Sequence, residues 1–550
     1  MNTSTQAPAE AHEERRQFFG AAKLIGGITL LSRVTGLVRD VMLARAFGAE
    51  RITDAFNMAF MIPNLFRRLF GEGALSAAFV PVFSETLERE GRPQASSLLA
   101  NVMGLLALWL AVLCVLVELG LLAAGLLVPS DWDVQLVLRL AGLMMPFMIS
   151  ICLLAVGSAA LNCIRHFAYP AAAPIILNAC NIAATVLLAP LWKTLESRLT
   201  VVAASVLVAS VLQLIGVLWV LRAHGLPWRP RLRPVHPGVR RMLRMMGPML
   251  VGLGILQLNA LGDKVIAWVF TATDKAPTLA LGAWRLRKPL EEGVVTWVNF
   301  AERLYQFPLG VLAIALATAV FPLFSRYAAR GDRENLRGSI NRALRLAVFE
   351  GLPSGVGLLL LAGPLAALLF TGRASHFTPQ DAAATAHVAR LYGIGMWAFC
   401  AQQVLLRAFY AQKDTITPLK VSCSVVALNF LLNLVLIWSP SIRHGAFGLS
   451  TSITASINVV VLAWILRRRL GRLGMRSLLG GIARIAAATG AMALVVWQTT
   501  IWLPRWGLDS NAARVGGGVT AGVAAYLLAC LVLRAPELAD ILPRGRSRPA

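Results

Sequence analysis

The chain of 550 residues is 57% hydrophobic and only 14% charged, with a mean hydropathy of +0.67. Soluble domains usually carry about 25% charged residues, so this composition excludes an ordinary soluble protein and predicts a polytopic membrane protein. The formal net charge is +25 and the pI is about 11.1. The basic residues alternate with apolar runs instead of gathering on one polar domain. This pattern argues against nucleic-acid binding and is typical of positive-inside topology.

The chain begins with a polar stretch over residues 1–17 that includes Glu10, Glu13 and Glu14. It has no short apolar core followed by a cleavage site, so we expect a cytoplasmic tail and not a signal peptide. The cysteines form no CxxC pair and no Cys/His pair at zinc spacing. We expect them to be buried thiols that pack as small apolar groups.

Apolar segments of membrane-spanning length recur along the chain, about fourteen in all. We therefore predict an all-α protein with spans at 22–47, 53–86, 97–128, 134–162, 170–192, 200–222, 240–271, 295–328, 338–371, 381–411, 416–438, 446–466, 477–503 and 513–534. Arginine and lysine concentrate in every second loop, which predicts an even number of spans and two cytoplasmic termini. The loop 272–294 is an exception, which we interpret as an insertion on the outer side; its basic residues are Lys275, Arg285, Arg287 and Lys288.

Two halves of the chain resemble each other. AAFVPVFSETLEREG at 77–91 aligns with TAVFPLFSRYAARGD at 318–332 and places Pro81 on Pro322. Internal repeats are characteristic of transporters, and the proline- and arginine-rich stretch 224–238 is a natural linker between the halves. The expected parts are a cytoplasmic tail at 1–21, a first lobe of six spans at 22–223, a cytoplasmic linker at 224–239, a second lobe of six spans at 240–470, two further spans at 471–535 and a cytoplasmic tail at 536–550.

Several arginines lie at bilayer depth. Arg33 is about eleven residues into an apolar stretch, close to the midplane of the membrane, where a lone arginine costs roughly 2.5–3.5 kcal/mol. Arg39, Arg67 and Arg303 are also too deep for easy snorkelling, whereas structural ion pairs remain an alternative for Arg45 and Arg68. The guanidinium fork binds phosphate with two parallel hydrogen bonds and stays charged when buried. The pattern therefore predicts a water-filled cavity that selects an anion, such as a phosphate or pyrophosphate head group.

Acids and breaks in the helices accompany these arginines. Asp40 shares a helix face with Arg33 and can pair with only one of the arginines. Pro63 interrupts the helix just before Arg67, and a Gly-Glu-Gly turn around Glu72 follows. Glu302 precedes Arg303 at the corresponding place in the second half.

The chain shows weak signs of an enzyme. His376 and Asp381 have the HxxxxD spacing of some acyltransferases, but Thr378 followed by Pro379 predicts a helix N-cap, with Asp381 favourable to the helix dipole. The sequence holds no P-loop, no dinucleotide-binding fingerprint and no HExxH. Transport would therefore be driven by an ion gradient or by the membrane potential.

A second polar group lies in the later spans. Asp263, Asn429, Asn433 and Thr451 offer oxygen ligands of the kind that suit a hard cation. Polar contacts that hold helices together are the alternative reading, and with a single carboxylate they are the slightly better one.

Three stretches identify a family resemblance. SRVTGLVRD (32–40), TDAFNMAFMIPNLFRRLFGEGALSAAFVPVF (53–83) and AERLYQFPLGVLAIALATAVFP (301–322) resemble the MurJ (MviN) family. This family comprises flippases that move lipid II, the undecaprenyl-pyrophosphate-linked peptidoglycan precursor, across the bacterial inner membrane. It belongs to the multidrug/oligosaccharidyl-lipid/polysaccharide exporter superfamily.

The resemblance implies a two-lobed cavity that opens alternately to each side of the membrane, with the spans at 471–535 forming a groove for the lipid tail. It implies that the diphosphate is bound by the essential arginines of the family, which match Arg33, Arg39, Arg67 and Arg303. The supporting motif residues match Asp40, Asp54, Asn64 and Glu72.

The chain departs from the family in two places. Some members have a sodium site that matches Asp263, Asn429, position 433 and Thr451, but with aspartate where this chain has Asn433, which puts tight sodium binding in doubt. The loop 272–294 is also longer than usual. Coupling to sodium or to the membrane potential both stay open, and no other cofactor is expected.

We therefore expect a multi-pass inner-membrane flippase with lipid II as its substrate, in contact with membrane lipids and with the cell-wall synthesis machinery. One alternative is an exporter of another polyprenyl-diphosphate-linked glycan, such as an O-antigen or capsule unit. A membrane-embedded glycosyl- or acyltransferase is the third reading.

Overall fold

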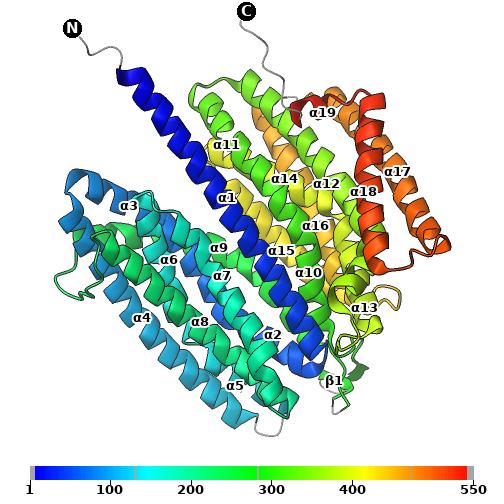
Figure 1. The fold of residues 1–550 in the computed structure, drawn as a ribbon, viewed down its shortest axis with the longest axis horizontal. Helices are drawn as coiled ribbons and strands as arrows, with labels where there is room; N and C mark the ends of the chain where they lie inside the picture. The colour runs from blue at the N-terminus through cyan, green and yellow to red at the C-terminus, as the bar shows by residue number, and fades with distance from the viewer. Residues whose placement is uncertain (1–5, 129–131, 275, 282–283, 472–473, 542–550) are drawn as a thin grey trace, which may run out of the picture. The chain divides into compact units, whose positions relative to one another are not determined.

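The computed structural model describes residues 6–128, 132–274, 276–281, 284–471 and 474–541, and it is almost entirely helical (Figure 1). The chain divides into two compact units, Met1–Gln257 and Leu258–Ala550, which are described separately below. The boundary between the units falls inside one helix, α9. The expected domain boundaries stay predictions.

The first unit consists of helices in sequence order. They are α1 (Gln6–Phe47), α2 (Arg51–Phe66), the π-helix η1 (Arg67–Ala74), α3 (Leu75–Arg89), α4 (Arg92–Leu127), α5 (Trp132–Met144), α6 (Phe147–Cys163), α7 (Ala168–Ala183), η2 (Ala184–Leu188), η3 (Ala189–Leu191), α8 (Leu195–Ala223) and the first part of α9 (Pro237–Val269). Within this unit α1 packs along α7, and α6 packs against α8.

The second unit continues from α9 with a short hairpin and further helices. They are β1 (Thr278–Leu281), β2 (Trp284–Arg287), α10 (Val294–Val311), α11 (Ala313–Ala329), α12 (Arg333–Phe370), α13 (Pro379–Ile394), α14 (Met396–Ala411), α15 (Ile416–Leu436), η4 (Arg443–Gly445), α16 (Ala446–Leu470), α17 (Met475–Arg505), α18 (Asn511–Val532) and α19 (Pro536–Ile541).

The predicted all-α membrane architecture is confirmed. Each expected span coincides with one helix or with consecutive helices, and in the part of the chain that the structure describes ten helices are long and apolar enough to cross a membrane. The count of about fourteen spans stays a prediction.

The aligned segments 77–91 and 318–332 occupy corresponding places in the two units. Each belongs to the second half of a broken span, α3 after η1 and α11 after α10, and each half-helix contains a proline, Pro81 or Pro322. The π-helix η1 begins four residues after Pro63, whose missing N–H interrupts the hydrogen bonds of α2. Single π-turns inside helices are frequent at functional sites.

The loop 272–294 contains a feature that the sequence analysis did not predict. Strands β1 and β2 form an antiparallel hairpin in which Thr278 lies opposite Arg287 and Leu281 lies opposite Trp284. Lys275 lies outside the described residues. The two strands of the hairpin thus pair their backbone groups with each other.

The linker is fastened to the first unit. The Asn101 side-chain amide on α4 donates to the Arg231 carbonyl at 2.9 Å, and its oxygen accepts from the His236 backbone N–H at 3.0 Å. A Cβ at Gly104 would lie 3.0 Å from the carbonyl oxygen of Arg231, so the glycine permits this close approach.

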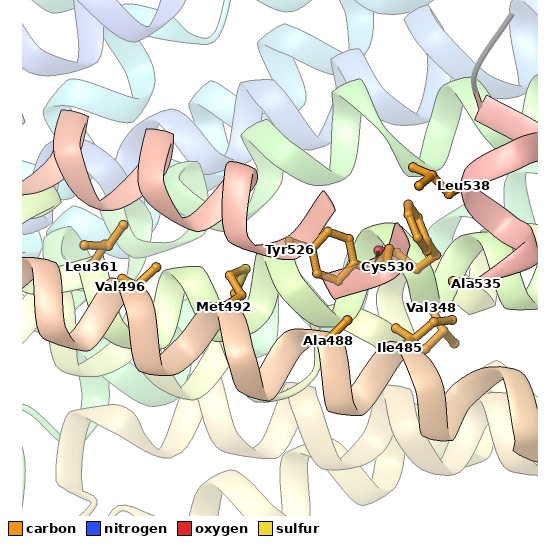
Figure 2. Packing of buried hydrophobic residues seen from close by; sticks show 11 residues of the cluster. Val348, Leu361, Ile485, Ala488, Met492, Val496, Tyr526, Cys530, Ala535 and Leu538 are labelled. Atoms are coloured by element: carbon orange, nitrogen blue, oxygen red, sulfur yellow. Dashed lines mark hydrogen bonds between the residues drawn. The ribbon is translucent and has the colours of Figure 1, made fainter. Parts of the chain in front are cut away.

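The two last long helices pack against α12 in the second unit. Figure 2 shows an apolar cluster from α12, α17, α18 and the segment after α18; its members include Val348, Leu361, Ile485, Met492, Val496, Tyr526, Cys530 and Leu538. Gly518 faces Leu361, and Gly522 faces Val496, so glycines on α18 allow close contact with both neighbours. All cysteines of the chain are free; Cys114, Cys152, Cys400 and Cys530 are buried, whereas Cys163, Cys180 and Cys423 are half-buried.

Candidate functional site

Arg39 is held in a fixed orientation on α1. Its Nε and Nη2 donate to the same oxygen of Asp40, at 3.0 and 2.7 Å, and its Nη1 donates to Oδ1 of Asn178 on α7 at 3.1 Å. The Asp40 side chain is nearly buried, whereas Arg39 is half-buried. A paired guanidinium costs less to bury than a lone one, and its position is set by groups on two helices.

Asn178 also binds the backbone and side chains of α1. Its Nδ2 donates to the Ser32 carbonyl at 3.2 Å and to the Thr35 hydroxyl at 3.0 Å. A Cβ at Gly36 would lie 3.5 Å from the same amide, so the absence of a side chain there lets α7 come close to α1. A single amide therefore joins the two helices and orients Arg39.

Arg33 is half-buried on α1 and makes no hydrogen bond or ion pair with another described residue. It lies seven residues before Asp40, two helical turns away on a similar face. Of these two arginines on α1, Arg39 is therefore already paired, whereas the donors of Arg33 remain for another partner.

The break between α2 and α3 positions two further arginines. Arg67 opens η1, and its Nε donates to Oδ1 of Asn64 at 2.8 Å. Arg68 donates through Nη1 to Oε1 of Gln257 at 3.3 Å, which agrees with a structural role for this arginine. Asp54 is fully buried in the first turn of α2. The side chain of Glu72 lies outside the described residues.

Arg303 and Glu302 belong to the second unit, on α10, and both are half-buried. The neighbouring Tyr305 ring packs on Tyr392 and Phe399, with ring centroids 4.5 and 5.2 Å apart. These aromatic contacts fix the same stretch of α10 that carries Arg303. Of the four arginines expected to bind substrate, three therefore belong to the first unit and one to the second.

The residues expected for a cation site lie close together in the second unit. Nδ2 of Asn433 donates to Oδ1 of Asp263 at 2.6 Å, and the Asn433 oxygen accepts from the Ser450 hydroxyl. The Asn429 amide lies 3.0 Å from Nδ2 of Asn433 and 3.0 Å from Oδ1 of Asp263. Asn429 lies 3.4 Å from the Thr451 hydroxyl. Asp263, Asn429 and Asn433 are all buried.

The arrangement turns an amide N–H toward the carboxylate of the cluster. This N–H belongs to Asn433, whose Nδ2 lies 2.6 Å from Oδ1 of Asp263. The amide thus points a donor at the oxygens that a cation would need. In the part of the chain that the structure describes, no group of three or more His, Cys, Asp or Glu side chains forms a metal site. The cluster fits polar contacts between helices.

The acyltransferase-type motif is a helix cap. Thr378 is the N-cap of α13 and Pro379 lies in the first turn, as the sequence predicted; in addition, Thr378 and Asp381 form a capping box. One oxygen of Asp381 accepts from the Thr378 backbone N–H at 2.8 Å, and the other accepts from the Trp297 indole at 2.9 Å. Both oxygens of this acid are therefore engaged in structural bonds.

Asn178 was not among the residues predicted from the sequence. The available signal was an asparagine inside an otherwise apolar span, in the run IILNACNIA at 175–183. An amide within a membrane span needs a partner, and the partner here turned out to be the arginine of another helix.

Comparisons with known proteins place the chain in a family. The family model described as lipid II flippase MurJ matches residues 43–516. The "Lipid II flippase MurJ" of Burkholderia cenocepacia is 34% identical over 465 residues, which cover 82% of this chain and 84% of that protein. The "Probable lipid II flippase MurJ" of Vibrio cholerae is 30% identical over 540 residues, covering 94% and 96%.

Solved structures share the fold. A chain titled "Lipid II flippase MurJ, inward closed conformation" has a TM-score of 0.74 at 24% identity and covers 93% of this chain and 99% of its own. An inward-facing multidrug resistance MATE family transporter of the MOP superfamily has a TM-score of 0.63 at 13% identity, covering 82% and 98%. The family is one of transporters and not of enzymes. From the family model that spans most of its length, and from its curated relatives, the chain belongs to the lipid II flippase MurJ family.

Proposed function

We propose that this chain translocates lipid II across the bacterial inner membrane by alternating access, and that Arg33, Arg39, Arg67 and Arg303 bind the diphosphate. The names of its relatives support the cargo. The presence of arginines in membrane-spanning helices supports the chemistry, because guanidinium groups bind phosphate oxygens in pairs.

The observation that carries the proposal is the fixation of Arg39 by Asp40 and Asn178. These bonds use one N–H on each nitrogen of the guanidinium, so Nη1 and Nη2 each keep an N–H for a further acceptor. A group that is held in place before substrate arrives loses little entropy on binding. Arg33 has no hydrogen-bond or ion-pair partner among the described residues. Its guanidinium would supply a second group on the same helix that can bind phosphate.

The driving force that we propose is the membrane potential. The Asp263 cluster has an amide where a sodium site needs an oxygen, so we derive no step through sodium. The diphosphate is anionic, and its outward movement from a negative interior is favoured by about 2.3 kcal/mol per charge per 100 mV.

We further propose that both termini are cytoplasmic, that the helices after residue 471 hold the lipid tail, and that the cell-wall synthesis machinery is a partner.

The test is complementation of cells depleted of their own lipid II flippase. Arg33→Ala, Arg39→Ala, Arg67→Ala and Arg303→Ala should each abolish growth while the protein still inserts in the membrane. Lysine at the same positions should restore growth only partly, since it keeps the positive charge but cannot bind phosphate with two parallel hydrogen bonds. Arg89→Ala, which removes an exposed arginine paired with Glu85, is the matched control and should complement.

Two outcomes would contradict the proposal. If all four alanine variants complement, the arginines do not bind an essential substrate. If depletion of this protein leaves cells intact but without a surface glycan, the cargo is a different polyprenyl-diphosphate-linked unit; lysis with accumulated lipid II is the expected result.

A further inference from the structure

The first unit contains a cavity that the proposed transport does not use. It has a volume of about 410 Å³ and lies between α4 and α5, which are neighbours in Figure 1. This volume is within the range of ligand pockets in proteins, about 300–1,000 Å³. The polar groups in its wall are Glu118 on α4 and Gln135 and Arg139 on α5.

Glu118 presents a carboxylate to this cavity. A Cβ at Gly142 would lie only 2.9 Å from its Oε2, so the glycine preserves the space that the carboxylate occupies. Glu118 makes no hydrogen bond or ion pair with any other described residue. It lies about 13 Å from the C-terminal end of α4, at 1.5 Å per residue. A carboxylate at that depth in a membrane span favours a cationic partner.

The neighbouring polar groups are oriented differently. Gln135 donates its amide to the carbonyls of Gly125 and Val128, at 2.6 and 3.0 Å, which leaves its oxygen as an acceptor near Gly125. Arg139 lies 3.5 Å from Glu196 of α8, and 61% of its side chain is exposed, so it keeps N–H groups for an anion. The cavity therefore has acceptors for a cation and a donor for an anion.

The outer wall of the cavity is apolar and continues along α4. Val115, Leu119, Leu122 and Leu126 are spaced four, three and four residues apart, as one helix face requires, and they are 58%, 56%, 63% and 75% exposed. Leu122 and Leu126 also line the cavity. A ligand that fills it can thus place an apolar chain on this exposed stripe.

We propose that this cavity binds the head group of a phospholipid that carries a primary ammonium. The ammonium would donate to Glu118 and to the Gln135 oxygen, the phosphate would accept from Arg139, and an acyl chain would lie along the stripe of α4. A primary ammonium has three N–H donors for these acceptors, whereas a quaternary ammonium has none. The geometry therefore favours ethanolamine over choline at the same charge.

The experiment measures lipid binding to the purified full chain by native mass spectrometry. Phosphatidylethanolamine, phosphatidylcholine and phosphatidylglycerol with identical acyl chains are the probes. Wild-type protein should bind phosphatidylethanolamine about tenfold more tightly than the other two, and Glu118→Gln should remove that preference. Gly142→Ala, which keeps the charge and crowds the carboxylate, should weaken the same binding. The control is Glu88→Gln on an exposed face of α3, which should bind as wild type.

Three results would overturn the proposal. Equal binding of phosphatidylethanolamine and phosphatidylcholine would show that no ammonium is recognised. Unchanged preference in Glu118→Gln would place the recognition elsewhere. Competition by soluble ethanolamine as strong as by the lipid would identify a site for free amines and not for a membrane lipid.

Discussion

The hydroxyl of Tyr526 on α18 donates a hydrogen bond of 2.8 Å to the main-chain carbonyl of Phe349 on α12. In a regular α-helix this carbonyl accepts from the N–H four residues later, but residue 353 is a proline and has none. Tyr526 therefore fills the place of the missing backbone donor. The rings of the two residues also pack together, with centroids 5.1 Å apart, inside the apolar cluster of Figure 2.

Removal of that hydroxyl should destabilise the second unit. Tyr526→Phe keeps the ring and leaves a buried carbonyl without a donor, which costs about 1–3 kcal/mol. Thermal unfolding of the purified protein should show a lower midpoint. Tyr410→Phe removes a hydroxyl from a partly exposed ring and is the control that should not change the midpoint. A midpoint in Tyr526→Phe equal to that of wild type would show that water supplies the missing bond.

The helical spans could be predicted because the apolar runs are long and the basic loops alternate. The N-cap at Thr378 could also be predicted, since Thr378, Pro379 and Asp381 lie within four residues of one another in the sequence. The hairpin in the loop 272–294 was not, because its pairing depends on register between two short strands of mixed composition.

The candidate site was predictable only in part. The arginines could be selected from the sequence because a buried charge is costly, so the depth of Arg39 made it a candidate. Its partner Asn178 lies 139 residues away in the sequence, and no local pattern connects the two. In the same way, nothing in the sequence connects Pro353 to Tyr526, which lies 177 residues from Phe349 and bonds to its carbonyl.

The loop before α15 should confer pH-dependent stability. Burial opposes the ionisation of Asp414, but hydrogen bonds from Thr417 and Arg469 outweigh it and lower the pKa to about 2, from a usual value of about 3.9. A lowered pKa contributes stability above the pKa of the unfolded chain, and this stability disappears as the pH falls from about 4 through about 2. Because solvent screens the pair, Asp414→Asn should lose no more than about 1 kcal/mol at pH 6.

The measurement compares the unfolding free energies of wild type and Asp414→Asn at a series of pH values. The difference between them should shrink in acid. Asp274→Asn changes an exposed aspartate and should equal wild type throughout. A difference that stayed constant from pH 6 to pH 2 would mean that charge plays no part in this contact.

Asn178 should act as a positioning residue for Arg39. Asn178→Leu removes the bond to Nη1 and both bonds to α1, so it should reduce lipid II transport by about tenfold or more, with normal membrane insertion. Asn178→Gln keeps an amide and should restore part of the activity. If the role were only structural, transport and thermal stability would fall together in both variants. The matched control is Asn181→Leu, since among the residues that the structure describes Asn181 bonds only to the Leu177 carbonyl of its own helix.

Asn433→Asp should create a sodium dependence that we do not expect in the wild type. The change replaces the amide that donates to Asp263 by a second carboxylate, so two like charges face each other beside the oxygens of Asn429 and Thr451. A sodium ion would relieve that repulsion, and a ligand that binds only the folded state raises the unfolding midpoint as its concentration rises.

This effect is measured by thermal unfolding in sodium chloride compared with choline chloride at equal ionic strength. The variant should be stabilised by sodium and the wild type should not, whereas Asn181→Asp, which adds a carboxylate without these oxygens, should show no specific response. An equal sodium shift in the wild type would contradict our reading of the cluster as a set of contacts between helices.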